Sequence, residues 1–341
     1  MANSKAATTS RAAPAEAPAI PTTMRAAVID RFGPPEVLGV RTVPVPQPGP
    51  REVLIALHAA GVGIWDAKIR DGTWASGEER FPLVLGADGA GVVAARGERV
   101  RRFRVGEWVW AYEYANPTGG FYAEYVAVDV DHVGRVPAEL DLLRAGAAAV
   151  TGLTALQGID VHLRVRRGET VLIFGASGAV GTLAVQFAKR RRARVLGTAT
   201  GDDAATLVLG LGADGVADAR RADFVERLRE LAPAGLDAVL ALAGGDALER
   251  AIDLVRAGGR VAYPNGVEPE PRRRDTLRPQ GYDAVADPRE WERLYHTVDE
   301  AKVQVPIAAV YPLEQAAEAH ARVERGHVLG RVVLRIREDG D

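Results

Sequence analysis

A glycine-rich stretch at 174–181, with the sequence FGASGAVG, constrains the fold of this chain more than any other feature. An apolar run of strand length, 169–174, precedes it, and apolar residues at helical spacing follow it at 183–189. A second apolar run of strand length comes at 193–197. Strand, glycine turn, helix and strand in this order form the βαβ unit that binds a dinucleotide.

The glycines of such a turn let the backbone approach a pyrophosphate, and the helix that follows offers free N–H groups and the positive end of its dipole. A purely structural turn between strand and helix is the alternative interpretation. We expect cofactor contacts from the whole loop, which consists of Gly175, Ala176, Ser177, Gly178, Ala179, Val180 and Gly181.

Length and charge narrow the possible classes of protein. At 341 residues the chain is too long for one ordinary core, so we expect two domains. A hydrophobic content of 47% and a charged content of 26% are typical of a soluble globular protein. The net charge of -2 gives no reason to expect nucleic acid or a membrane as a partner. By our reading, no apolar run approaches the ~20 residues that span a bilayer.

The chain contains no cysteine. Disulfides, thiolate zinc sites and a cysteine nucleophile are therefore excluded, and a reducing, cytoplasmic location is expected. Residues 1–23 are rich in Ala, Pro and Thr, contain a single acid, Glu16, and lack the apolar core of a secretory signal. We predict that they form a disordered tail, with an organelle transit segment as the alternative.

The pattern of the first part of the chain is typical of a β-barrel-like domain. From residue 24 to about 130, short strand-like runs alternate with Gly and Pro. The strands predicted there are 24–29, 53–58, 91–95, 108–111 and 122–128.

After Pro137 the pattern changes. A helix of small residues at 142–157 leads into alternating strands and helices, which indicates a parallel, doubly wound sheet. The Pro- and Arg-rich stretch 264–287 is predicted to be a loop. The predicted strands are 171–174, 194–198, 215–217, 238–242, 260–263 and 331–336, with further helices at 222–231, 247–255 and 288–301.

From residue 24 to about 336, the chain resembles the zinc-independent quinone oxidoreductase branch of the medium-chain dehydrogenase/reductase superfamily. The resemblance rests on segments in the family's order, which are 61–70, 82–91, 119–125, 151–155, the glycine loop, 211–214, 257–261 and 330–334. It implies an α/β fold with a GroES-like β-barrel catalytic domain at 24–145 and 288–341, and a Rossmann NAD(P)-binding domain at 146–287. It also implies a nicotinamide in the cleft between the domains, and a homodimer or homotetramer.

The resemblance also addresses the zinc question. Zinc-dependent relatives place a Cys and a His-Glu pair at the positions that match Gly63, Ala87 and Asp88. A catalytic zinc needs about three N, S or O protein ligands around an open position, and one acid does not supply them. The six histidines show no metal-ligand spacing. We therefore expect no zinc, and without a strong Lewis acid the oxidation of alcohols is disfavoured.

Hydride transfer to an electron-poor acceptor needs less help, because a quinone or an α,β-unsaturated carbonyl spreads the incoming charge onto oxygen. The resemblance places Lys68 in the cleft beside the nicotinamide, where its ammonium can stabilise an enolate or donate a proton. The alternative for Lys68 is a surface ion pair with Asp66 or Asp71.

Aromatic residues are further candidates for the acceptor site. Trp74 matches a position where an aromatic ring stacks on flat acceptors, with core packing as the alternative. Tyr112 is also expected to reach the cleft, as is Tyr122.

The residues at the end of the second strand of the βαβ unit indicate whether the cofactor is NADPH or NADH. This end carries Thr198 and Thr200 instead of the acid that holds the ribose 2′-OH in NAD binders, which favours NADPH over NADH. Relatives grip the 2′-phosphate from positions that match Ala204 and Ala219, so Arg220 is the substitute that we predict.

Two further positions join the predicted cofactor site through the resemblance. Thr154, with Thr151, matches positions that contact the nicotinamide half, and helix capping is the alternative role. Gly244 follows a strand in which relatives carry an Asp where Ala241 stands here.

The sequence thus predicts a zinc-independent, NADPH-dependent reductase that transfers hydride to quinones or α,β-unsaturated carbonyls. An enoyl-thioester reductase of secondary metabolism is a second enzymatic interpretation, since the hydride chemistry is shared. A non-catalytic dinucleotide-binding redox sensor is the alternative from another class, and the departures at Gly63, Ala204 and Ala241 keep it open.

Overall fold

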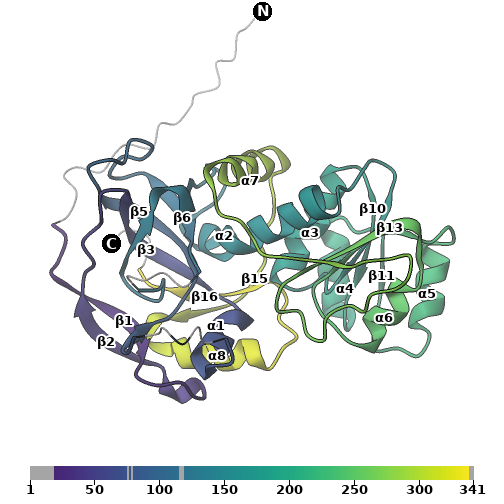
Figure 1. The fold of residues 1–341 in the computed structure, drawn as a ribbon, viewed down its shortest axis with the longest axis horizontal. Coiled ribbons are helices and arrows are strands. Elements are labelled where there is room, and N and C mark those ends of the chain that lie inside the picture. The colour runs from purple at the N-terminus through teal and green to yellow at the C-terminus, as the bar shows by residue number, and fades with distance from the viewer. Residues whose placement is uncertain (1–18, 75–76, 78–79, 115–118, 338–341) are drawn as a thin grey trace, which may run out of the picture.

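The computed structural model describes residues 19–74, 77, 80–114 and 119–337. Two bodies lie side by side in Figure 1: a parallel sheet flanked by helices, and a second body built mainly of antiparallel strands. Helix α2 (Leu142–Gln157) lies between them and packs on both.

The parallel sheet has the strand order β11-β10-β9-β12-β13-β14, and all neighbouring strands in it are parallel. Counted from β9, this is the order 3-2-1-4-5-6 of the doubly wound dinucleotide-binding fold. Its strands are β9 (Thr170–Phe174), β10 (Arg194–Thr198), β11 (Gly215–Ala217), β12 (Leu236–Ala241), β13 (Val255–Pro264) and β14 (Gln280–Tyr282). The helices between them are α3 (Ala179–Arg190), α4 (Asp202–Gly210), α5 (Phe224–Leu231) and α6 (Asp246–Ile252).

The second body contains two sheets. The larger has the order β15-β16-β3-β5-β6-β8, with β7 also paired to β3, and the smaller has the order β2-β1-β4. The strands are β1 (Thr23–Ile29), β2 (Gly39–Pro44), β3 (Glu52–Val62), β4 (Leu83–Val84), β5 (Asp88–Arg96), β6 (Trp108–Tyr112), β7 (Tyr125–Asp129), β8 (Val133–Arg135), β15 (Ile307–Pro312) and β16 (Arg331–Arg335). Because β16 pairs antiparallel with β3, the end of the chain completes a sheet that its beginning starts.

Short helices accompany this body. Helix α1 (Ile64–Asp71) follows β3, and α8 (Ala316–Glu324) precedes β16. Single helical turns are found at Pro35–Val37, Val130–His132 and Leu313–Gln315.

Helix α2 is built of small residues because the backbone of β3 approaches it closely. A Cβ on Gly146 would lie 2.8 Å from the Ala59 carbonyl oxygen. With the π-helical turn Gly158–His162, α2 forms a segment that is long and apolar enough to cross a membrane by length and composition. This corrects our reading that no apolar run approaches that length. Packing accounts for the apolar character, since 89% of the segment's most apolar window is buried inside the fold.

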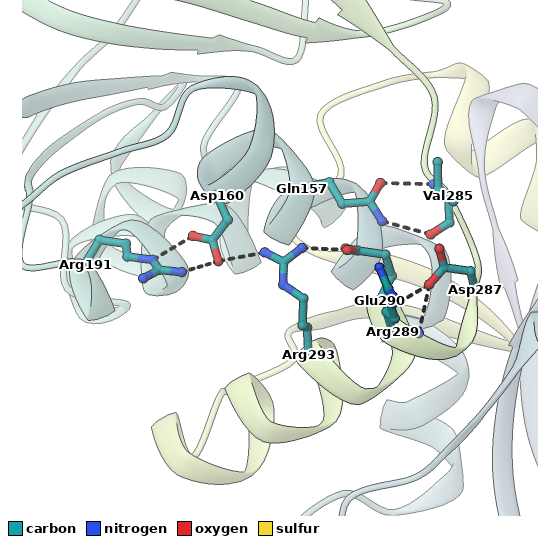
Figure 2. A network of polar contacts seen from close by, with 8 residues as sticks. All are labelled: Gln157, Asp160, Arg191, Val285, Asp287, Arg289, Glu290 and Arg293. Atoms are coloured by element: carbon teal, nitrogen blue, oxygen red, sulfur yellow. Dashed lines mark hydrogen bonds and ion pairs between the residues drawn. The ribbon is translucent and has the colours of Figure 1, made fainter.

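Helix α7 (Pro288–Ala301) joins the two bodies at the end of α2 (Figure 2). Asp160, in the turn after α2, accepts hydrogen bonds from Arg191 at 2.7 Å and from Arg293 of α7 at 3.2 Å. The side chain of Gln157 pairs twice with the backbone of Val285, at 2.8 and 2.9 Å. Asp287 caps α7 by accepting from the N–H groups of its first turn.

Most predicted elements are found, and four predicted boundaries coincide with the structure, at 142–157, 194–198, 215–217 and 288–301. Three expectations are wrong. β14 lies inside the stretch predicted as a loop, because it pairs with the end of β13. The helix predicted at 247–255 ends at Ile252, since Val255 already pairs with Leu236 of β12, and β13 therefore begins before residue 260.

Some elements were not predicted from the sequence. α1 and α8 are short and rich in charged residues, and β2 and β15 lie at sheet edges with alternating exposure. The predicted tail, 1–23, lies outside the described residues as far as residue 18, and β1 begins at Thr23.

Candidate functional site

The glycine loop connects the end of β9 to the start of α3. Gly175 has a φ of 91°, a left-handed conformation that residues with a Cβ rarely adopt. Its N–H donates to the hydroxyl of Thr198 at 2.7 Å, and the N–H of Ala176 donates to the Thr198 carbonyl at 3.1 Å. The predicted cofactor residue Thr198 is buried and supports the loop from the end of β10.

The two later glycines of the loop differ in their surroundings. A Cβ on Gly181 would lie 2.2 Å from the Gly175 carbonyl oxygen, so this glycine allows close packing of α3 against the loop. A Cβ on Gly178 would meet only that same oxygen, at 3.6 Å, so the space beside Gly178 is open. Since α3 begins at Ala179, its free N–H groups lie at this open space, and the loop fits a bound pyrophosphate.

Other segments surround the loop. The N–H of Gly330 donates to the Ser177 carbonyl at 2.9 Å, and Gly178 and Gly330 form an isolated β-bridge. On the other side, a Cβ on Gly244 would lie 2.2 Å from the Pro269 carbonyl oxygen. The loops that follow β12 and β13 therefore pack on each other at the carboxyl edge of the sheet, where doubly wound folds bind their ligands.

The predicted 2′-phosphate residue, Arg220, lies beyond the end of β11. Its guanidinium pairs with Asp218 at 3.4 Å and is largely exposed. Burial disfavours the Asp218 carboxylate, but the N–H groups of Arg220 and Gly201 and the Arg220 guanidinium outweigh it and lower its pKa. Gly201 follows Thr200, which is half-buried, so Arg220 lies beside the end of β10 together with an acid that the sequence analysis did not consider.

The structure brings Lys68 and Trp74 together where helix α1 of the β-rich body meets the loop after β13 of the parallel-sheet body. The Lys68 ammonium lies 2.8 Å from the Glu268 carboxylate, in the loop after β13, and 5.0 Å from the centroid of the Trp74 ring. The surface pairing of Lys68 with Asp66 or Asp71 is therefore wrong. Trp74 is half-buried and lies against Gly266, where a Cβ would be 2.2 Å from its ring.

Tyr112, at the end of β6, is half-buried in the second body. Burial raises the pKa of its hydroxyl, and the charges of Asp88 and Asp283 raise it further. Since Asp283 follows β14, Tyr112 lies toward the same loops of the parallel-sheet body as Lys68. Tyr122, in contrast, is fully buried, so our expectation that it reaches the cleft is wrong.

The positions that match zinc ligands hold a different arrangement. A Cβ on Gly63 would lie 2.4 Å from the Trp65 ring, so the indole fills the space of a side chain there. The buried Asp88 pairs with the buried Arg331 at 2.8 Å, and that guanidinium lies over Trp65. Within the described residues, no three His, Cys, Asp or Glu side chains are grouped to hold a metal ion. The donor set does not fit a catalytic zinc.

A network of buried polar side chains connects α1 to α8 and was not predicted from the sequence. Asp66 accepts from the Gly63 N–H at 2.8 Å, and its pKa is raised to about 7, chiefly by burial. The Tyr122 hydroxyl bonds to Asp66 and lies 3.3 Å from His320 Nε2. His320 Nδ1 lies 3.2 Å from Arg70, which also pairs with Glu324 at 2.7 Å. Apart from the contact between Asp66 and the Gly63 N–H, the partners in this network are distant in the sequence, so no local pattern indicates it.

Thr154 and Thr151 lie in the middle of α2. Both hydroxyls donate to carbonyls one turn earlier, at 2.8 Å, and both side chains are buried. The helix is capped by Asp141, so the capping role suggested for these threonines is wrong. Tyr282 of β14 donates to the Thr154 carbonyl at 2.9 Å, which ties α2 to the parallel sheet.

The chain matches two family models and is similar to known proteins along most of its length. Residues 49–138 match the family model of the alcohol dehydrogenase GroES-like domain, and residues 211–334 match that of zinc-binding dehydrogenases. The human quinone oxidoreductase is 32% identical over 327 residues, which covers 91% of this chain and 97% of that protein. An alcohol dehydrogenase of Rhizobium meliloti is 32% identical over 347 residues, covering 92% and 98%.

Solved structures agree in fold. The crystal structure of an NAD-dependent alcohol dehydrogenase has a TM-score of 0.85 at 34% identity, and covers 92% of this chain and 100% of its own. The quinone oxidoreductase from Coxiella burnetii has a TM-score of 0.80 at 29% identity, with the same coverage.

Together, the doubly wound sheet, the glycine loop and these relatives define an NAD(P)H-dependent oxidoreductase. The chain belongs to the medium-chain dehydrogenase/reductase superfamily, in its quinone oxidoreductase branch. The predicted fold class, a GroES-like domain plus a Rossmann sheet, is confirmed.

Proposed function

We propose that this protein is a zinc-independent, NADPH-dependent reductase that transfers hydride to quinones or α,β-unsaturated carbonyls. The observation that carries the proposal is the position of Lys68. Its ammonium lies beside Trp74 and contacts Glu268 in the loop after β13, at the carboxyl edge of the parallel sheet. The residues that match zinc ligands are Gly63, Ala87 and an Asp88 whose carboxylate is already paired with Arg331.

NADPH, when bound, supplies the hydride. The N–H groups at the start of α3 and the open space beside Gly178 hold its pyrophosphate. The Lys68 ammonium donates a hydrogen bond to the acceptor oxygen, stabilises the negative charge that develops there, and gives that oxygen a proton, which water then replaces. Trp74 offers a flat surface on which a quinone or enone stacks, and Tyr112 borders the same cleft.

Arg220 and its partner Asp218 favour different cofactors. Arg220 supplies a cation for a 2′-phosphate, and its partner Asp218 supplies an acceptor for a 2′-OH. The end of β10 carries no acid, and a mycobacterial relative at 27% identity was solved in complex with NADPH, so we propose NADPH over NADH. The 34% identical alcohol dehydrogenase is described as NAD-dependent, so binding of both nucleotides has to be measured side by side.

The test is consumption of NADPH with a panel of quinones and enones, in the wild type and in Lys68→Met. We expect turnover in the wild type and a loss of about a hundredfold in kcat/KM in the variant, because the charge at the acceptor oxygen is lost. Binding of NADPH is expected to be unchanged. Lys189→Met is the matched control, since Lys189 pairs with Asp214 away from the cleft.

Other outcomes assign other functions. No NADPH consumption with any acceptor contradicts the proposal. A coenzyme A or carrier-protein thioester that outperforms free enones assigns an enoyl-thioester reductase. Tight NADPH binding without turnover, insensitive to Lys68→Met, assigns a redox sensor.

We also propose the division of the chain given by the resemblance, with a catalytic domain at 24–145 and 288–341 and a nucleotide-binding domain at 146–287; residues 338–341 lie outside the described part. Pairing of β16 with β3 supports joining the chain's last part to its first. A homodimer or homotetramer and a cytoplasmic location complete the proposal, and analytical ultracentrifugation of the purified protein tests the assembly.

A further inference from the structure

An ion pair between Glu268 and Lys68 connects the two bodies. Lys68 lies on α1 of the β-rich body, whereas Glu268 lies on the loop after β13 of the parallel-sheet body, and 2.8 Å separates Nζ from Oε2. The side chain of Lys68 is 17% exposed and that of Glu268 is 64% exposed. The lysine side chain is thus mostly enclosed, and the glutamate side chain is mostly exposed to solvent.

Backbone contacts hold the loop that carries Glu268 in place. Gly266 has a φ of 91° and allows the loop to contact the ring of Trp74. The N–H of Trp74 in turn donates to the Lys68 carbonyl at 3.0 Å. Glu268 therefore approaches Lys68 from a loop that Trp74 and the Gly244 segment hold on two sides.

The other carboxylates near Lys68 have other partners. Asp66 points into the buried network and accepts from the Gly63 N–H. Asp71 accepts from the N–H of Thr73 at 2.8 Å. Among the residues that the structure describes, Glu268 is the one carboxylate in an ion pair with Lys68.

The residue type at position 68 matters in this chain. Of its 43 basic residues only Lys5, Lys68, Lys189 and Lys302 are lysines, so nearly all other cations are arginines. An arginine does not release a proton in proteins, whereas a lysine does, and its long flexible side chain needs a partner to stay in one place.

We propose that Glu268 is a positioning residue for Lys68, holding its ammonium at the acceptor oxygen. The inference rests on the proposed function, because Lys68 is the group that touches the acceptor. Glu268 itself touches neither acceptor nor cofactor in this scheme.

The experiment is a double-mutant cycle on kcat, with Glu268→Gln, Lys68→Met and the double variant, measured with NADPH and the best acceptor of the panel. Glu268→Gln is expected to lower kcat about fivefold, the worth of one partly exposed ion pair, while the Kd for NADPH stays unchanged. Glu268→Asp is expected to restore part of that loss. In the Lys68→Met background, Glu268→Gln is expected to have no further effect, because it acts through Lys68.

Glu270→Gln is the matched control, as Glu270 lies on the same loop and bonds to Tyr263 instead. It removes the same charge and is expected to leave kcat unchanged. Turnover by the wild type together with an unchanged kcat in Glu268→Gln overturns this inference alone, as do additive effects in the cycle or an equal loss in Glu270→Gln. Absence of turnover in the wild type overturns the proposed function, and the inference with it.

Discussion

His320 is buried, and its burial and the neighbouring Arg70 both favour the neutral ring. His320 lies between Arg70, on its Nδ1 side, and the Tyr122 hydroxyl, on its Nε2 side. Burial and, to a smaller extent, the charge of Arg70 lower its pKa to about 3. Since arginine only donates, Nδ1 must accept, which leaves the proton on Nε2 to be donated to Tyr122.

A pH dependence of stability follows from this histidine. Its pKa lies below the ordinary 6.5 in the folded state, so its contribution to stability is complete above pH 6.5 and is lost as the pH falls toward 3. His320→Gln removes the titrating group, so the unfolding temperature of this variant is expected to fall less between pH 7 and pH 4.5 than that of the wild type. Thermal unfolding followed by circular dichroism measures it.

The exposed His296→Gln is the control, and its pH dependence should match the wild type. At pH 7 we expect His320→Gln to be destabilised by about 1–2 kcal/mol, because the amide does not reproduce the geometry with which the two ring nitrogens face Arg70 and the Tyr122 hydroxyl. Equal slopes for His320→Gln and the wild type would contradict the assignment.

At the scale of elements, Gly178 and Gly181 of the glycine loop have different structural surroundings. The contact of a Cβ at Gly181 with the Gly175 carbonyl would push α3 away from β9. The same atom at Gly178, where φ is -78°, would only occupy the open space beside the helix start. Gly181 thus allows close packing of α3 on the loop, and we propose that Gly178 leaves room for a ligand.

Two alanine substitutions separate these roles. Gly181→Ala is expected to lower stability by about 2 kcal/mol or more, since the backbone must shift. Gly178→Ala is expected to keep the unfolding temperature of the wild type but to weaken NADPH binding at least tenfold, because its methyl group takes the space of the pyrophosphate. Thermal unfolding and calorimetric titration with NADPH measure the two effects. Similar losses of stability in both variants would refute the distinction.

Over the whole molecule, the junction at α7 holds the two bodies together. Asp160 is almost fully buried and binds both Arg191, at the end of α3, and Arg293 of α7 (Figure 2). Arg293 has a second partner in Glu290 at 2.6 Å. Two arginines from different elements thus depend on one carboxylate.

Asp160→Asn is expected to destabilise the protein by about 2 kcal/mol, because it takes the charged partner from two guanidinium groups at once. Faster amide hydrogen exchange in α7 is the expected local signature. Glu290→Gln is the control, since it weakens one partner of Arg293 and leaves Asp160 in place. If both variants exchange at the wild-type rate in α7, the junction does not depend on Asp160.

The sequence by itself determined the βαβ unit, the alternation of strands and helices after residue 137, and the lack of zinc-ligand types at Gly63 and Ala87. These follow from local pattern and residue type, which neighbours in the chain decide. Even so, β14 and the start of β13 were missed, because pairing at a sheet edge depends on a partner strand rather than on the segment itself.

Only the tertiary structure decided the partners of the charged and polar groups. Glu268 for Lys68, Arg331 for Asp88 and the glycine loop for Thr198 are contacts between segments far apart in the sequence. The position of a residue in the sequence does not indicate which distant residue will contact its side chain in the folded protein. Folding within each body sets the partners of Asp88 and Thr198, and the contact between the two bodies sets that of Lys68. Burial then favours the partner that compensates each charge or polar group.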